Sequence, residues 1–302
     1  MQRFPRFVLR LIAVLPLALL HRLGSVLGWA MYGISPTYRR HLRANLRQAG
    51  YADARTRREA IAAAGRMLAE LPVLWFRPHG EVVALVKQVD GFESALAARA
   101  QGKPVLFLTP HLGCFEIAAQ YAAAHTPITV LYRSPKLAWL EPLMREGRSR
   151  QNVRLAPANR SGVRELFAAL RRGEAIGLLP DQVPGEGEGE WAQYFGRSAY
   201  TMTLAARLAE REDLRCYLAY AKRLPRGAGY TLTVRPLPEA LPGERPTRRL
   251  NRALEELVRE DPGQYLWGYN RYKIPRGAPP PGTPRSPSAR DPLVRGSAKV
   301  SR

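Results

Sequence analysis

The segment Val105-Leu-Phe-Leu-Thr-Pro-His-Leu-Gly-Cys-Phe-Glu116 contains an apolar run, a turn and the beginning of an amphipathic helix. The apolar run stops shortly before His111, Gly113 marks a tight turn, and the helical pattern starts at Phe115. This order predicts a buried strand, a turn and a helix, with the imidazole of His111 in the turn. Glu116 falls in the first helical turn, where we expect its carboxylate to approach the imidazole, fix its tautomer and make it a stronger base.

Apolar runs alternate with helical patterns on both sides of this segment. The predicted strands are 82–86, 105–109, 128–132, 153–156 and 175–179, followed by the pair 214–221 and 230–235. This alternation predicts an α/β domain over residues 33–276, with a central mixed, mostly parallel sheet flanked by helices. The tail 277–302 is rich in Pro, Ser, Gly and Arg without periodicity, which predicts disorder.

Polar residues follow three of the predicted strands. His111 comes after 105–109, Arg133 after 128–132, and Asp181 with Gln182 after 175–179. In open α/β sheets ligands bind at the carboxyl ends of the strands, so these side chains are expected to converge. The plainer readings are a buried, hydrogen-bonded histidine, a surface cation and a carboxylate that stabilises a turn.

The composition of the chain is strongly basic. Its 302 residues include 47 Lys and Arg against 25 Asp and Glu, a net charge of +22. This charge predicts an anionic partner such as nucleic acid, an anionic membrane or a phosphorylated ligand. The basic residues are spread over the whole chain, and no helix-turn-helix, RNP or zinc-finger signature is present, which argues against nucleic acid. Two cysteines, Cys114 and Cys216, are too few for a disulfide framework or a zinc site, and we expect no metal or cofactor.

Residues 7–32 are the most apolar stretch of the sequence, and we assign them to an N-terminal segment, residues 1–32. Arg10, Pro16, His21 and Arg22 interrupt it, which argues against a continuous span of roughly 20 apolar residues. The first fifty residues contain eight arginines and no acidic residue, a pattern typical of segments at an anionic cytoplasmic membrane face. We therefore expect a membrane-associated helical segment embedded in one leaflet; the alternative is a buried core helix.

Five ordered blocks resemble the bacterial lipid A late acyltransferases of the lauroyl and myristoyl type, a branch of the lysophospholipid-acyltransferase group. The blocks are His111-Leu-Gly-Cys-Phe-Glu116, Tyr132-Arg-Ser-Pro-Lys136, Pro180-Asp-Gln182, Tyr194-Phe-Gly196 with Thr201, and Pro262-Gly-Gln-Tyr-Leu-Trp267 before Asn270-Arg-Tyr-Lys273. Their order and spacing extend the resemblance over most of residues 1–275.

The resemblance implies an O-acyltransferase that moves a fatty acyl chain from an acyl carrier protein thioester to a hydroxyl of a lipid A precursor. Such an enzyme would work at the cytoplasmic face of the bacterial inner membrane, in contact with anionic lipid. His111 would be the general base and Glu116 its partner, and the substrate-binding residues would be Arg133, Lys136, Asp181 and Gln182. Cys114 lies inside the motif, and we expect it to pack rather than to form a thiol-acyl intermediate.

Two other functions stay open at this point. One is an acyltransferase for a lysophospholipid, glycerol phosphate or another glycolipid, although members acting on glycerol phosphate typically carry an acidic E-G-T-R-like motif where this chain has Pro180-Asp-Gln182. The other is a non-catalytic basic protein that binds membranes or nucleic acid. Residues 185–190 alternate Gly and Glu without the lysine and helix of a phosphate-binding loop, so we expect a mobile loop near the substrate mouth.

Overall fold

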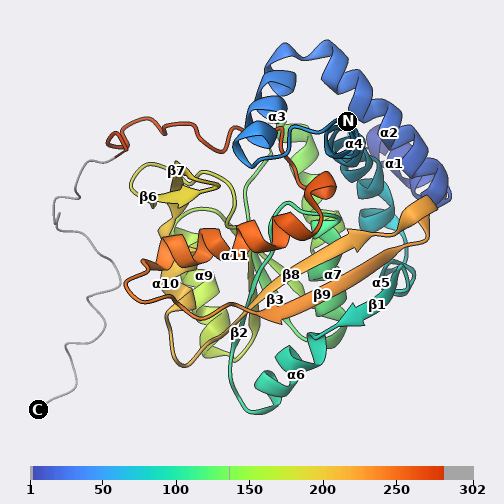
Figure 1. Cartoon of the computed structure of the whole chain (residues 1–302). Coiled ribbons are helices and arrows are strands. Elements are labelled where there is room, and N and C mark those ends of the chain that lie inside the picture. The colour runs from blue at the N-terminus through green and yellow to red at the C-terminus, as the bar shows by residue number, and fades with distance from the viewer. Residues whose placement is uncertain (1–2, 136, 282–302) are drawn as a thin grey trace, which may run out of the picture.

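A seven-stranded sheet in the order β1-β9-β8-β2-β5-β3-β4 forms the centre of the computed structural model, which describes residues 3–135 and 137–281 (Figure 1). Its strands are β1 (Val86–Asp90), β2 (Val105–Leu108), β3 (Ile128–Tyr132), β4 (Val153–Pro157), β5 (Ala175–Leu178), β8 (Arg215–Arg223) and β9 (Tyr230–Pro236). Within this sheet of the described residues, β8 and β9 pair antiparallel, and the other neighbouring strands run parallel. The predicted α/β class with a mixed, mostly parallel sheet is confirmed.

Helices cover both faces of this sheet. The α-helices of the described residues are α1 (Arg3–Ala13), α2 (Leu17–Ile34), α3 (Pro36–Gln48), α4 (Ala54–Phe76), α5 (His79–Val83), α6 (Phe92–Ala100), α7 (Phe115–His125), α8 (Glu141–Arg148), α9 (Arg160–Arg171), α10 (Thr203–Ala209) and α11 (Pro246–Glu260). Three short 3₁₀ helices, η1 (Ala138–Leu140), η2 (Pro225–Gly227) and η3 (Pro262–Gln264), lie in the connections.

All four residues of strand β2 are buried. Successive side chains of a strand point to opposite sides of the sheet, so β2 is covered on both faces. Leu106 and Leu108 belong to the core cluster that includes residues of α9, α10 and α11. Val105 and Phe107 belong to the second cluster, with residues of α6, α7 and α8. The uninterrupted apolar run before His111 is therefore that of a central strand between two helical layers.

Two local predictions differ from the structure. The expected strand 82–86 is instead the end of the short helix α5, and β1 begins only at Val86. Pro78 precedes α5 as its N-cap residue, and Val82 is buried as a helical residue, so burial rather than strand alternation explains this valine-rich run. Part of the expected mobile loop at 185–190 is ordered, because Gly189 starts the hairpin β6 (Gly189–Tyr194) and β7 (Arg197–Met202).

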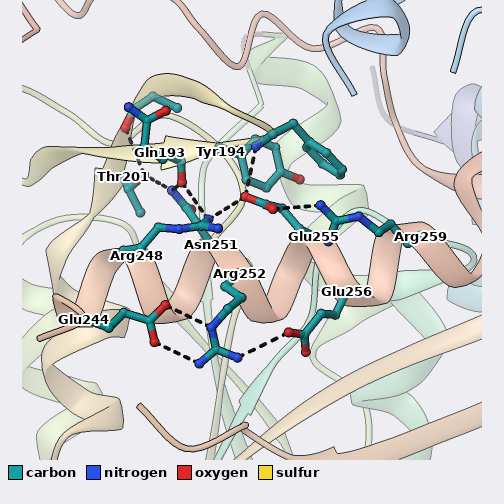
Figure 2. Close-up of polar contacts among 12 residues, drawn as sticks. Gln193, Tyr194, Thr201, Glu244, Arg248, Asn251, Arg252, Glu255, Glu256 and Arg259 are labelled. Carbon is teal, nitrogen blue, oxygen red and sulfur yellow. Dashed lines mark hydrogen bonds and ion pairs between the residues drawn. The ribbon is translucent and has the colours of Figure 1, made fainter. Parts of the chain in front are cut away.

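Helix α11 holds this hairpin by a set of buried polar contacts (Figure 2). The side-chain amide of Asn251 donates to the carbonyl of Gln193 (3.0 Å) and to the hydroxyl of Thr201 (2.9 Å). The carboxylate of Glu255 accepts from the backbone N–H of Phe195 (2.9 Å) and also pairs with Arg248. Since buried polar groups are costly when unpaired, these bonds fix the position of the hairpin against α11.

The N-terminal helices α1 and α2 lie against α4 at the upper right of Figure 1. Among the described residues no single helix is long and apolar enough to cross a membrane; α1 and α2 reach that length and composition only together, with a bend of 118° between them. Helix α2 approaches α4 closely, since a Cβ atom on Gly28 would lie 2.1 Å from the carbonyl oxygen of Ile61. The segment is thus packed on the α/β domain, and its contact with a membrane stays a prediction.

A buried ionic cluster joins this N-terminal layer to the sheet. Glu70 of α4 accepts from both Nε and Nη2 of Arg223 on β8 (2.8 Å each), and His21 Nε2 of α2 lies 2.6 Å from the same carboxylate. Burial raises the pKa of Glu70, but Arg223 and the hydrogen bonds with both partners more than offset this and lower it to about 2. Glu70 therefore stays ionised at neutral pH.

Candidate active site

The turn after β2 positions His111. Gly113 has a φ of +59°, and a Cβ atom there would lie 2.0 Å from the carbonyl oxygen of Ala221, so both its conformation and its packing require glycine. The next residue, Cys114, donates its backbone N–H to that same carbonyl at 2.7 Å, and α7 begins directly afterwards. The predicted strand, turn and helix are confirmed.

A C-terminal segment supports this turn from the other side. Leu266 donates its N–H to the carbonyl oxygen of His111 (3.0 Å), and Gly113 donates to the carbonyl of Gln264 (3.1 Å). The side chain of Gln264 forms a further pair of bonds with the backbone of Arg223, at 2.9 and 3.2 Å. The block Pro262–Trp267 is therefore part of the frame that holds the histidine.

Asp181 is the carboxylate that contacts His111. Its Oδ1 lies 2.8 Å from Nδ1 of the imidazole, and its Oδ2 accepts the backbone N–H of His111 at 2.9 Å. Because β2 and β5 are parallel neighbours, the residues after their ends meet at the same edge of the sheet. The carboxylate assigns the proton to Nδ1, which leaves the Nε2 lone pair free to accept a proton.

Gln182 completes the contacts of the ring, with its Nε2 amide 3.1 Å from Nε2 of His111. Asp181 is only 2% exposed. Its burial raises the pKa of the carboxyl group, but the neighbouring His111 and the hydrogen bonds from it outweigh burial and lower the pKa overall. Asp181 is thus an ionised group against the imidazole.

Glu116 has a different partner from the expected one. Its carboxylate forms a bidentate ion pair with Arg148 of α8. Nε of the guanidinium lies 2.9 Å from Oε2, and Nη2 contacts Oε1. The indole N–H of Trp75 is a further contact, at 3.5 Å from Oε2. The expectation that Glu116 holds the ring of His111 is corrected: Asp181 occupies Nδ1, and the first turn of α7 directs Glu116 toward α4 and α8.

A cavity of about 250 Å³ opens beside these residues. His111, Glu116, Arg133, Arg148 and Gln182 line it together with apolar side chains of β3, β4 and α7. Arg133 is exposed at the end of β3, next to β5 in the sheet. The structure thus gathers the residues of three strand ends around one cavity, while Lys136 lies outside the described residues.

Arg148 is a site residue that the sequence did not indicate. Nothing in the sequence pattern of α8 singles out Arg148 as the arginine that reaches Glu116. A second, apolar cavity between α7 and the sheet shares Phe115, Ala119 and Leu179 with the first. The cavity next to His111 therefore has charged and apolar walls, and a small apolar cavity of about 30 Å³ lies beside it.

Cys114 faces away from this chemistry. It is buried in the core cluster with Ile117, and burial raises the pKa of its thiol well above the usual range. A neutral thiol is a poor nucleophile. Within residues 3–135 and 137–281, no group of three or more His, Cys, Asp or Glu side chains is arranged to hold a metal ion.

Residues 4–274 match the family profile of the bacterial lipid A biosynthesis acyltransferases. The chain belongs to this family. It is 26% identical over 218 residues to the lipid A biosynthesis palmitoleoyltransferase of Escherichia coli strain K12, covering 71% of this chain and 70% of that protein. It is 27% identical over 224 residues to the lauroyltransferase of the same organism, covering 71% of each chain. A lipid A biosynthesis acyltransferase of Haemophilus influenzae is 24% identical over 184 residues, covering 59% of this chain and 56% of that protein.

Proposed function

We propose that this member of the lipid A acyltransferase family transfers a fatty acyl chain from an acyl carrier protein thioester to a hydroxyl of a lipid A precursor. The observation that carries the proposal is the His111–Asp181 pair, whose histidine lines a cavity with both charged and apolar walls. Its relatives are named for lauroyl and palmitoleoyl transfer in lipid A biosynthesis, which supports a fatty acyl donor and a lipid A acceptor.

In this mechanism His111 is the general base. Its Nε2 accepts the proton of the acceptor hydroxyl as the oxygen attacks the thioester carbonyl, and Gln182 gives up its contact with Nε2 to that hydroxyl. The tetrahedral intermediate then expels the thiolate, which takes the proton back from the imidazolium. The new ester forms as the thioester breaks, and no covalent enzyme intermediate is required.

Asp181 stabilises the imidazolium during this step. It is ionised, buried and bonded to Nδ1, as a carboxylate must be to favour the charged ring. General base catalysis of this kind contributes about 10²–10⁴-fold to the rate. Holding the hydroxyl and the thioester together in the cavity must contribute much of the remaining acceleration.

Glu116 keeps a functional role in the proposal, through Arg148. The carboxylate neutralises and orients a guanidinium in the wall of the cavity, a group suited to bind an oxyanion or a phosphate. Arg133, at the exposed side of the same cavity, is the second cation suited to an acceptor phosphate. Lys136 follows it closely in sequence and is proposed as a further phosphate contact.

The exposed face of α1 and α2 supports contact with an anionic membrane. Phe4, Phe7, Leu11 and Val14 of this region are all more than half exposed, with Val14 at 74%. The eight arginines of the first fifty residues add the positive charge that anionic lipid attracts. We propose that this surface lies on the cytoplasmic face of the bacterial inner membrane, where acyl carrier protein and a lipid precursor are both within reach.

The test is the variant His111→Ala, assayed with acyl carrier protein thioester and a tetra-acylated lipid A precursor. We expect the rate to fall by at least about a hundredfold, the low end for a general base. His125→Ala is the matched control, because His125 is exposed at the C-terminal end of α7, and its one hydrogen bond among the described residues is to the backbone of Tyr121. Near-normal turnover of His111→Ala would refute the mechanism.

A second measurement separates the acceptors. Lipid A from a strain lacking this protein should carry fewer acyl chains by mass spectrometry. An unchanged acyl count, combined with activity of the purified protein toward a lysophospholipid, would replace the proposed acceptor and leave the chemistry at His111 intact.

A further inference from the structure

Gln120 lies in the wall of the active-site cavity, one helical turn beyond Glu116. Residues four apart on a helix share a face, so both side chains of α7 point to the same side. The two residues line the cavity that also contains His111. Gln120 is only 2% exposed, whereas most glutamine side chains are found at the protein surface.

The neighbours of Gln120 fix the orientation of its amide. The side-chain Nε2 lies 3.4 Å from the carbonyl oxygen of Gly147 and 3.4 Å from that of Arg148. Both neighbours can only accept hydrogen bonds, so the NH₂ group must face them and the opposite assignment is excluded. The Oε1 atom is left as the acceptor, and it has no hydrogen-bond partner in the described part of the chain.

We propose that Oε1 of Gln120 accepts a hydrogen bond from a neutral substrate group, a hydroxyl or an amide N–H, bound in the cavity. A buried acceptor without a donor is unfavourable, and a ligand that supplies the donor removes that penalty. Anionic groups lack a proton to donate. An ammonium group would bring a further cation into a cavity that Arg133 and Arg148 already line.

The inference rests on the proposed function, which brings two sources of such a donor to this cavity. One is the amide-containing arm that carries the thioester of acyl carrier protein. The other is a hydroxyl or amide of the lipid A precursor. The shared chemistry is a neutral hydrogen-bond donor, and steady-state kinetics distinguishes the two sources because each substrate has its own KM.

The test is Gln120→Met, which keeps the length of the side chain and removes the acceptor. We expect the KM of one substrate to rise about three- to tenfold, the range that one hydrogen bond gives, with kcat at saturation changed by less than about twofold. A raised KM for the acyl thioester identifies the donor arm, and a raised KM for the lipid identifies the acceptor. Asn152→Ala is the control, because it removes an amide bond to the carbonyl of Ala123 (3.0 Å) on the same helix.

Unchanged KM values for both substrates would overturn the inference and leave only water against Oε1. If Gln120→Met does not fold, Gln120→Asn withdraws the acceptor by one methylene group, keeps a buried amide, and should raise the same KM. Absence of acyl transfer by the wild-type protein would instead refute the proposed function. In that case the rise in Tm caused by an acyl-pantetheine or by the lipid precursor still tests Gln120: a smaller rise in the variant supports the inference, and equal rises overturn it.

Discussion

Replacing Asp181 by Asn tests which carboxylate serves His111. Asp181 accepts two bonds from this one residue, from Nδ1 at 2.8 Å and from the backbone N–H at 2.9 Å. An Asn side chain has one acceptor oxygen and one NH₂ group, so it cannot accept both. If its NH₂ group faces the ring, Nδ1 must become an acceptor, and Nε2 then carries the proton and no longer serves as a base.

The expected effect on the rate is therefore large. A base in the wrong tautomer loses the general-base contribution of about 10²–10⁴-fold, while substrate contacts elsewhere in the cavity remain. The effect on the fold is smaller. One bond to a charged group is lost at a site that is 2% exposed, so we expect the free energy of unfolding to fall by about 1.5–3 kcal/mol.

The dependence of stability on pH is a second readout of the same variant. The folded-state pKa of Asp181 lies below its ordinary value of 3.8, so this residue stabilises the fold above that value. The contribution is lost as the pH falls through the folded pKa. Urea unfolding at neutral pH and below pH 3.8 should show that the Asn variant loses less stability on acidification than the wild-type protein.

Glu116→Gln is the matched control for the rate. It removes the charge that faces Arg148 and leaves the bonds between Asp181 and His111 in place. We expect initial rates with saturating thioester and lipid to fall by less than about tenfold, far less than for Asp181→Asn. The reverse order, or near-normal turnover of Asp181→Asn, would show that Glu116 is the working partner of the histidine and would refute the assignment made from the structure.

Three further predictions follow from other contacts. Gly113→Ala should reduce kcat by at least about tenfold without abolishing folding, because a methyl group 2.0 Å from the Ala221 carbonyl must displace the catalytic turn; unchanged kcat would contradict the packing. Glu70→Gln should lower the free energy of unfolding by about 3–5 kcal/mol, because it leaves Arg223 buried without its charge partner. It should also remove part of the loss of stability between pH 4.5 and about 2, the interval in which ionised Glu70 gains its proton. Denaturant unfolding curves at both ends of that pH interval test this. Val14→Glu should weaken sedimentation with anionic vesicles and leave Tm nearly unchanged, since this side chain is 74% exposed; unaltered binding would place the lipid contact elsewhere.

The packing of α2 also determines how membrane contact should be tested. Gly24, Gly28 and His21 of this helix lie against α4, and His21 contacts the buried Glu70. Removing the apolar N-terminal residues would expose this surface and leave part of the ionic cluster without its partners. Loss of membrane binding after such a truncation could therefore result from unfolding as well as from loss of an anchor. Substitution of a single exposed residue such as Val14 distinguishes these two causes, because it leaves the packing of α2 on α4 in place.

Much of the fold could be predicted because its signals are local. A short apolar run buried on both faces, a glycine at positive φ and an amphipathic segment specify the β2 strand, its turn and α7 within about twenty residues. The strand pair β8 and β9 was recognisable in the same way. The valine-rich segment near Val82 was misread, because a short apolar run in a helix and one in a strand have the same composition until their partners are known.

The sequence by itself determined where His111 stands, at the end of a central strand, and that polar residues follow the neighbouring strands. Only the tertiary structure decided which carboxylate the imidazole meets. Glu116 is five positions away along the chain, yet the direction of its side chain depends on how α7 rotates against α4 and α8. Asp181 is seventy residues away, and the parallel pairing of β2 with β5 brings it to hydrogen-bonding distance of the ring. Strand pairing is a long-range property, so distance along the chain was the wrong guide to the partner of the histidine.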